Sequence, residues 1–175
     1  MITDTSALLQ KMLENTYAQA DMYRRLSVLR QCVEYAVFTE TSMSYEEECT
    51  LFLSKLDNRE DAIAVQAWGD DVFRAFTKKN IGKLMQELQE KVDTLPLLKL
   101  YVAVALPEEE VAKIAKWCRA EVRDGMLLDM QVDPQVAGGC AFVWDDTHHD
   151  FSFHSRMKAV PGAITQELEK YAKNE

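Results

Sequence analysis

Apolar side chains recur at spacings of three and four along residues 1–93, the period of a helix with one buried face. Neither proline nor glycine occurs before Gly69, so the strongest helix breakers are absent from this stretch. Ser44 and Glu47 form a capping box at one helix start. Asn58 caps the next helix, which Gly69 is expected to close. We expect five or six short helices packed as an antiparallel bundle, with apolar seams between them.

The hydrophobic period changes from 3.6 to 2 just after Pro96. A strand is expected there, with one face formed by Leu98, Leu100, Val102 and Val104. Pro107 and the three glutamates that follow it predict a helix start, and Gly125 predicts its end. We therefore divide the chain into an N-terminal helical bundle, residues 1–93, and a second domain, residues 97–175, and expect each to fold separately.

Residues 127–153 combine alternating apolar positions with turn signals. Leu128, Met130 and Val132 define a strand that must end at Pro134. Two adjacent glycines at 138 and 139 then let the backbone turn, and we expect Gly138 at an angle costly for other residues. Further strands are expected at residues 140–144 and, after a polar corner at 145–149, at 150–153. The pattern predicts a three-stranded antiparallel unit.

The order of these elements sets the expected fold class. After the bundle come strand, helix, three strands and a last helix, which is expected to start near Pro161 and to carry Ile164, Leu168 and Tyr171. We predict an α+β fold overall: an N-terminal antiparallel helical bundle followed by a small α+β domain with a four-stranded sheet and two helices.

Charge and composition exclude several classes of function. The net charge of −9 is unsuited to a nucleic-acid partner, which needs a basic face. No apolar run is long enough to span a bilayer, and the first residues lack the pattern of a signal peptide, so we expect the chain to stay where it is made. Four widely separated cysteines suit buried thiols in a reducing compartment better than disulfides.

One cluster of six potential metal ligands lies within ten residues, and it supports an alternative function. The cluster consists of Asp145, Asp146, His148, His149, Asp150 and His154. His148 and Asp150 share a strand face, whereas His149 and His154 point to opposite faces, so a solvated hairpin tip explains the cluster better than a metal site. No nucleophile elbow, phosphate-binding loop or Cys-x-x-Cys motif is present. The sequence therefore predicts no catalytic residue and no cofactor.

Tryptophan is a frequent anchor at protein interfaces. Trp144 lies in an apolar run and is expected in the core, whereas Trp117 falls beside the inward-facing positions Ile114 and Cys118. Trp117 is therefore a candidate partner-binding residue at the edge of the covered face.

The C-terminal half resembles a known family. The string V-D-P-x-x-x-G-G, an apolar strand, a polar corner and D-x-S are similar to the C-terminal domain of the delta subunit of F-type ATP synthases, called the oligomycin sensitivity-conferring protein in mitochondria. The matching positions are Val132, Asp133, Pro134, Gly138, Gly139, Asp150 and Ser152, with Arg156 at a usually basic position. Phe151 replaces the usual glycine of D-G-S, and the tail past Ser152 is longer than is usual.

This resemblance implies a noncatalytic subunit of the peripheral stalk, which links the catalytic head of a proton-translocating ATP synthase to its membrane sector. In that family the N-terminal domain holds the N-terminal helix of the α subunit, and Tyr17, Ala18 and Ala20 resemble the Y-A-x-A string of that domain. The C-terminal domain engages the b subunits. The chain would be peripheral at the cytoplasmic face of a bacterial plasma membrane, in contact with it only through the complex.

The resemblance also implies that Asp133, Pro134, Gly138, Gly139, Asp150 and Ser152 are structural turn residues. Two other functions stay open. One is a metal-binding protein or metal-dependent enzyme that uses the hairpin of residues 145–154. The other is the E-type stalk subunit of vacuolar or archaeal-type ATPases, whose C-terminal domain has a similar strand pattern but whose N-terminal helix is very long.

Overall fold

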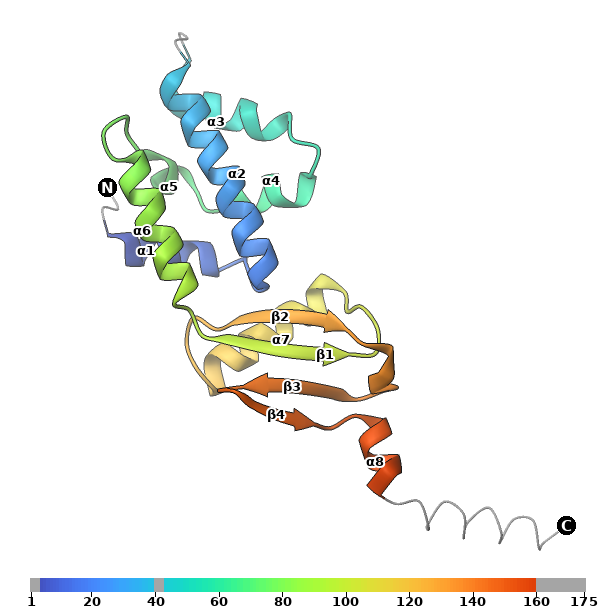
Figure 1. Cartoon of the computed structure of the whole chain (residues 1–175). Coiled ribbons are helices and arrows are strands. Elements are labelled where there is room, and N and C mark those ends of the chain that lie inside the picture. Colours follow the sequence, from blue (N-terminus) through green and yellow to red (C-terminus); the bar gives the residue numbers. More distant parts are fainter. Residues whose placement is uncertain (1–3, 40–42, 160–175) are drawn as a thin grey trace, which may run out of the picture.

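The computed structural model describes residues 4–39 and 43–159 and has an α+β fold, as the sequence predicts (Figure 1). The N-terminal half consists of α1 (Thr5–Leu13), α2 (Gln19–Phe38), α3 (Tyr45–Ser54), α4 (Arg59–Gln66), α5 (Asp70–Arg74) and α6 (Ile81–Asp93). The C-terminal half consists of β1 (Leu97–Val102), α7 (Glu108–Glu121), β2 (Leu127–Val132), the 3-10 turn η1 (Pro134–Val136), β3 (Cys140–Trp144), β4 (Thr147–Asp150) and α8 (Phe153–Ala159).

The helical half packs its apolar stripes into one core around α2. The capping box of α3 is present, and the Asn58 side chain accepts a hydrogen bond from the backbone N–H of Asp61 at 3.2 Å, so both predicted helix starts are confirmed. The role assigned to Gly69 is wrong. Helix α4 already ends at Gln66, and Gly69 adopts a φ of +86° just before α5. The chain needs the glycine there to start a new helix in another direction.

The strand order is β2-β1-β3-β4, with β1 parallel to β2 and antiparallel to β3. The expected three-stranded antiparallel unit is therefore wrong, because β1 lies between β2 and β3. The crossover through α7 brings β2 beside β1 in a parallel arrangement, which leaves the other edge of β1 for β3. The antiparallel pair of β3 and β4 is confirmed.

The hairpin between β3 and β4 is tighter than the sequence suggested. Asp145 and Asp146 form a two-residue turn with φ values of +50° and +59°, which matches the twist of paired strands. Both His148 and His149 consequently lie on β4 rather than in a loop, and the expected strand at residues 150–153 is shifted toward the N-terminus. Helix α8 begins at Phe153. The helix expected from Pro161 lies outside the described residues.

The resemblance residues lie in the loops on either side of β3. The Asp133 side chain accepts a hydrogen bond from the backbone N–H of Gln135 at 2.9 Å, which starts η1 at Pro134. Asp150 accepts from the N–H of Ser152 at 2.8 Å. The Ser152 hydroxyl then accepts from the N–H of Ser155 at 3.0 Å, in the first turn of α8. These side chains therefore shape local turns, the role that the resemblance implies for them.

Both glycines of the turn have positive φ, +133° at Gly138 and +74° at Gly139. The expected angle at Gly138 is confirmed, but the closer contact is at its neighbour. A Cβ atom on Gly139 would lie 2.5 Å from the backbone oxygen of Phe151, and a backbone atom cannot move aside as a flexible side chain can.

We expect Gly139→Ala to lower the free energy of unfolding by about 2–4 kcal/mol, because the new methyl group adds a backbone clash to an unfavourable φ. Urea unfolding followed by circular dichroism measures this change. Gly82→Ala is the matched control: Gly82 lies in α6 with no atom near its would-be Cβ, so alanine there should stabilise the protein by about 0.5–1 kcal/mol. Equal effects at the two positions would contradict the prediction.

The two halves of the described chain touch along β2, the strand nearest the bundle (Figure 1). The backbone N–H of Leu128 donates a hydrogen bond to the backbone carbonyl oxygen of Tyr17 at 3.0 Å, and Ala18 forms a β-bridge with Leu128. Leu127 is buried in the core of the helical half. Separate folding of residues 1–93 and 97–175 stays a prediction, and it would require these contacts to be dispensable.

Candidate functional site

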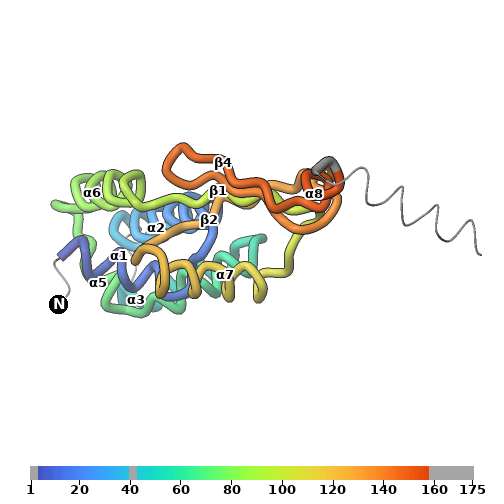
Figure 2. Tube along the Cα trace, turned by 90° about the horizontal axis from the view of Figure 1, so that it is seen from below, coloured from blue at the N-terminus to red at the C-terminus, as the bar shows by residue number. Residues whose placement is uncertain are grey.

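Helix α7 covers one face of the sheet only in part. It lies against that face (Figure 2), and its main contacts with a strand are to β2. There Ala115 and Cys118 of α7 form a small buried core with Met126 and Leu128. A helix is about 10 Å wide, whereas the outer axes of four strands are about 14 Å apart. One helix therefore leaves part of the apolar face open.

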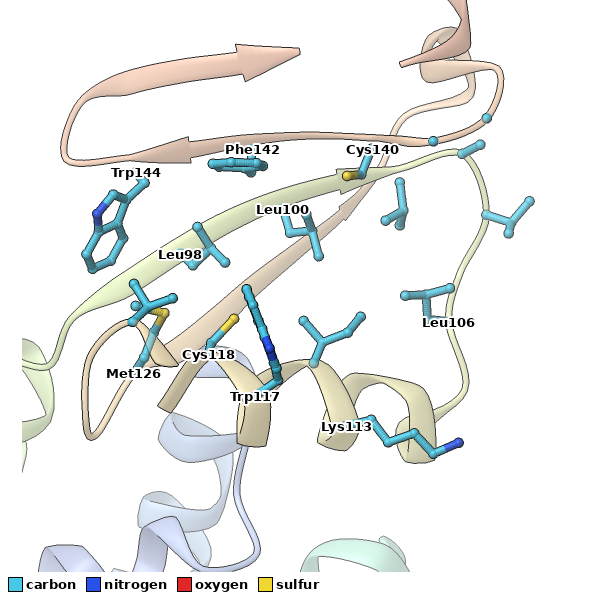
Figure 3. Close-up of a pocket in the computed structure, with 17 residues that line it drawn as sticks. Leu98, Leu100, Leu106, Lys113, Trp117, Cys118, Met126, Cys140, Phe142 and Trp144 are labelled. Atoms are coloured by element: carbon cyan, nitrogen blue, oxygen red, sulfur yellow. The ribbon is translucent and has the colours of Figure 1, made fainter. Parts of the chain in front are cut away.

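The open part is a groove of about 870 Å³ between α7, β1 and β3 (Figure 3). Its walls include Leu98, Leu100 and Val102 of β1, Cys140, Phe142 and Trp144 of β3, and Ile114, Trp117 and Cys118 of α7. Lys113 is the one charged side chain in this lining. A groove of this size and composition favours an apolar occupant that brings few unpaired polar groups.

Trp117 forms part of the groove wall. Its side chain rises from α7 toward the sheet (Figure 3), and 62% of its surface is exposed. The sequence placed Trp117 at the edge of the covered face, and the structure confirms that position. Trp144 is half-buried and lines the same groove from β3. A large exposed aromatic side chain in an apolar groove is a typical interface anchor, and partner binding by Trp117 stays a prediction.

The apolar surface continues past β3 toward the end of the described chain. The Phe142 ring stacks on His149 of β4 at 4.8 Å between centroids and on Phe151 at 5.8 Å. Phe151, Phe153 and Met157 are among the exposed large apolar side chains. Sequence analysis missed this groove, although alternation along three neighbouring strands carries a signal for it. Three strands with apolar side chains on one face need more cover than α7 provides.

Tyr17, Ala18 and Ala20, the other predicted partner-binding residues, lie apart from the groove. The cationic groups of Lys116 and Arg119 lie over the Tyr17 ring, 5.5 and 5.4 Å from its centroid. The Tyr17 hydroxyl donates a hydrogen bond to the backbone carbonyl oxygen of Glu14 at 3.0 Å. Ala20 is exposed at the start of α2. Tyr17 and Ala18 thus contact this chain's own α7 and β2, and their binding of a partner stays a prediction.

The His-Asp hairpin places its side chains on different faces of the sheet. His149 packs on Phe142, whereas His148 and Asp150 face the opposite side. Hydrogen bonds from the Ser152 side chain and backbone hold the pKa of Asp150 below its ordinary value. Over residues 4–39 and 43–159, no three His, Cys, Asp or Glu side chains come together in a way that could hold a metal ion. The geometry of the hairpin does not favour the metal-binding alternative.

A polar network fixes the junction of the two halves. Asp61 is buried between Arg24 and Arg25, and Arg25 also donates to the Thr16 hydroxyl at 3.0 Å. Arg119 donates to three backbone oxygens, those of Met126, Leu13 and Thr16, at 2.8, 2.6 and 2.8 Å. These groups bond to one another or to backbone oxygens, and these bonds hold the fold together at the junction.

Two of the buried thiols, those of Cys32 and Cys118, are poor nucleophiles in this structure. Cys32, Cys49 and Cys118 are buried, and Cys140 is half-buried at the groove. Hydrogen bonding to Cys49 and burial raise the pKa of Cys32, and burial raises the pKa of Cys118, so both stay protonated at neutral pH. The confirmed burial of three cysteines agrees with the sequence-based interpretation.

No helix among the described residues combines the length and apolar character that crossing a membrane requires. No protein-family model matches the sequence, and neither does any curated protein.

Proposed function

We propose that this protein is a noncatalytic peripheral-stalk subunit of a rotary F-type ATP synthase, which links the catalytic head to the membrane sector. The apolar groove beside α7 carries the proposal, because a stalk subunit must bind a partner protein and does not convert a substrate. The order of elements adds support. Six helices followed by strand, helix, three strands and helix is the order that the resemblance implies.

The groove suits a helix of the b subunits. An amphipathic partner helix presents apolar side chains at i, i+3, i+4 and i+7, and these would fill the space between Trp117 and Phe142. Lys113 at the groove can meet an acidic residue on the flank of such a helix. The b subunits would hold the protein at the cytoplasmic face of the membrane without direct lipid contact.

The helical half would hold the N-terminal helix of the α subunit. Phe38 and Ile63 are exposed on α2 and α4, with 63% and 66% of their surfaces accessible, and they offer apolar contacts on the bundle. The two partners would thus bind at opposite ends of the molecule, as a link under torque requires.

Calorimetry of the full chain with a C-terminal b-subunit peptide from the same organism tests the proposal. We expect Trp117→Ala to weaken binding at least about tenfold, because it removes a large apolar anchor. The heat-capacity change of binding should be negative, and binding should persist at about 0.5 M salt, where charge interactions are screened.

Two controls accompany this measurement. Glu109→Ala changes an exposed residue of the same helix outside the groove and should leave binding of the b peptide unchanged. The α-subunit N-terminal peptide should bind the Trp117→Ala variant as tightly as the unaltered chain. Failure of the unaltered chain to bind either peptide would overturn the proposed function.

A further inference from the structure

Helix α8 starts at one end of the groove. Gly138 lines the groove, and a Cβ atom on Gly138 would lie 3.7 Å from the Cβ of Phe153, the first residue of α8. The seven residues of α8 span about 10 Å. Helix α8 therefore starts beside the Cys140 end of the groove, and the described chain ends at Ala159, about 10 Å farther along this helix.

The residues that follow carry the pattern of an occupant for this groove. Residues 160–175 lie outside the described part of the chain, and their sequence is VPGAITQELEKYAKNE. Pro161 and Gly162 interrupt helical continuation after α8. Ile164, Leu168 and Tyr171 then recur at spacings of four and three, with charged residues between them. This spacing is typical of a helix with one apolar face, which needs a surface to cover it.

The length of the apolar stripe is compatible with the length of the groove. On a helix, the step from Ile164 to Tyr171 covers about 10 Å, and along a strand the step from Cys140 to Trp144 covers about 14 Å. The three residues between α8 and Ala163 can span about 10 Å, enough to return to the Cys140 end of the groove. The sequence motif shared with the stalk family ends before this stretch, so the resemblance does not account for it.

We propose that residues 160–175 of this chain occupy its own apolar groove when no partner is bound. Ile164 would lie near Cys140, Leu168 over Phe142, and Tyr171 toward Trp144. The groove is then self-covered, and a partner helix must displace the segment before it can bind. This inference goes beyond the proposed stalk function and does not rest on it, because the segment and the groove belong to the same chain.

An apolar fluorescent dye, anilinonaphthalene sulfonate, tests whether the groove is covered. We expect the full chain to bind little dye, and a chain that ends at Ala159 to bind several-fold more, because the truncation uncovers the groove. Leu168→Glu in the full chain should have the same effect. Gln166→Glu adds the same single charge on the opposite face of the stripe and should leave dye binding unchanged. Equal dye binding by the full and truncated chains would overturn the proposal.

A disulfide trap gives the location. Ile164→Cys, treated with diamide, should form a bond to Cys140 within one chain; the two thiols lose two electrons and two protons, which reduce diamide to its hydrazine. Gln166→Cys should not form this bond. Peptide mapping identifies the linked pair. A bond that joins two chains would show that the segment covers the groove of a second copy and would overturn the intramolecular assignment. Absence of any bond from Ile164→Cys to Cys140 would overturn it as well.

Discussion

Asp61→Asn should lower the free energy of unfolding by about 3–5 kcal/mol, the usual cost of removing one partner from a buried ion pair. Only 1% of the Asp61 side chain and 4% of the Arg25 side chain are exposed, and their atoms approach to 3.2 Å. The neutral amide would leave the buried Arg25 cation with Glu108 as its carboxylate partner, at 3.5 Å, and 61% of the Glu108 side chain is exposed to water. Urea unfolding of both proteins at neutral pH measures the difference.

Asp21→Asn is the matched control. Asp21 also pairs with Arg24, at 2.8 Å, but both side chains of that pair are substantially exposed, so the loss should be below about 1 kcal/mol. If the two variants lose equal stability, burial of Asp61 is not what makes its ion pairs important.

The same carboxylate predicts a pH dependence. Burial acts to raise the pKa of Asp61, but hydrogen bonds and charges from Arg24 and Arg25 outweigh it and hold the pKa below its ordinary value. A lowered pKa in the folded state means that the stabilisation is complete above the unfolded value of about 3.9 and is lost as pH falls through the folded value. Unfolding at a series of pH values below about 4 should therefore weaken the unaltered chain more steeply than Asp61→Asn.

Arg119→Met should lower the free energy of unfolding by about 3 kcal/mol or more. It removes three charge-assisted hydrogen bonds and leaves the backbone carbonyl oxygens of Met126, Leu13 and Thr16 without this donor. Leu13 and Thr16 belong to the helical half and Arg119 to α7, so the loss falls on the junction of the two halves. Hydrogen exchange should show faster exchange at β2 and at the connection between α1 and α2.

Lys116→Met separates this role from the contact with the aromatic ring. Lys116 lies over the same Tyr17 ring as Arg119, at 5.5 Å, but it is exposed. Its replacement should cost below about 1 kcal/mol. An Arg119→Met variant as stable as Lys116→Met would show that the three hydrogen bonds do not hold the halves together.

Local signals carried much of the fold. The caps at Ser44 and Asn58, the change of period at Pro96 and the alternation of β2 each depend on a few neighbouring residues, and each is present in the structure. These features can be predicted locally, because helix capping, the effect of proline and side-chain alternation depend on residues only a few positions apart in the sequence.

The hairpin shows where local reading fails. Period 2 predicts a strand near Asp150 but not its first residue, since a turn of two or of five residues preserves the alternation on either side. The choice of the two-residue turn at Asp145 and Asp146 came from pairing with β3, which the sequence does not display.

The sequence by itself determined that this protein has a helical half followed by an α+β half, and it placed Trp117 at the edge of the covered sheet face. Only the tertiary structure decided that β1 lies between β2 and β3, that Arg119 joins the two halves, and that Trp117 and Phe142 share a groove. These features depend on contacts between residues far apart in the chain. A hydrophobic pattern states which side chains must be buried, but the partner that buries each one follows from how the elements pack.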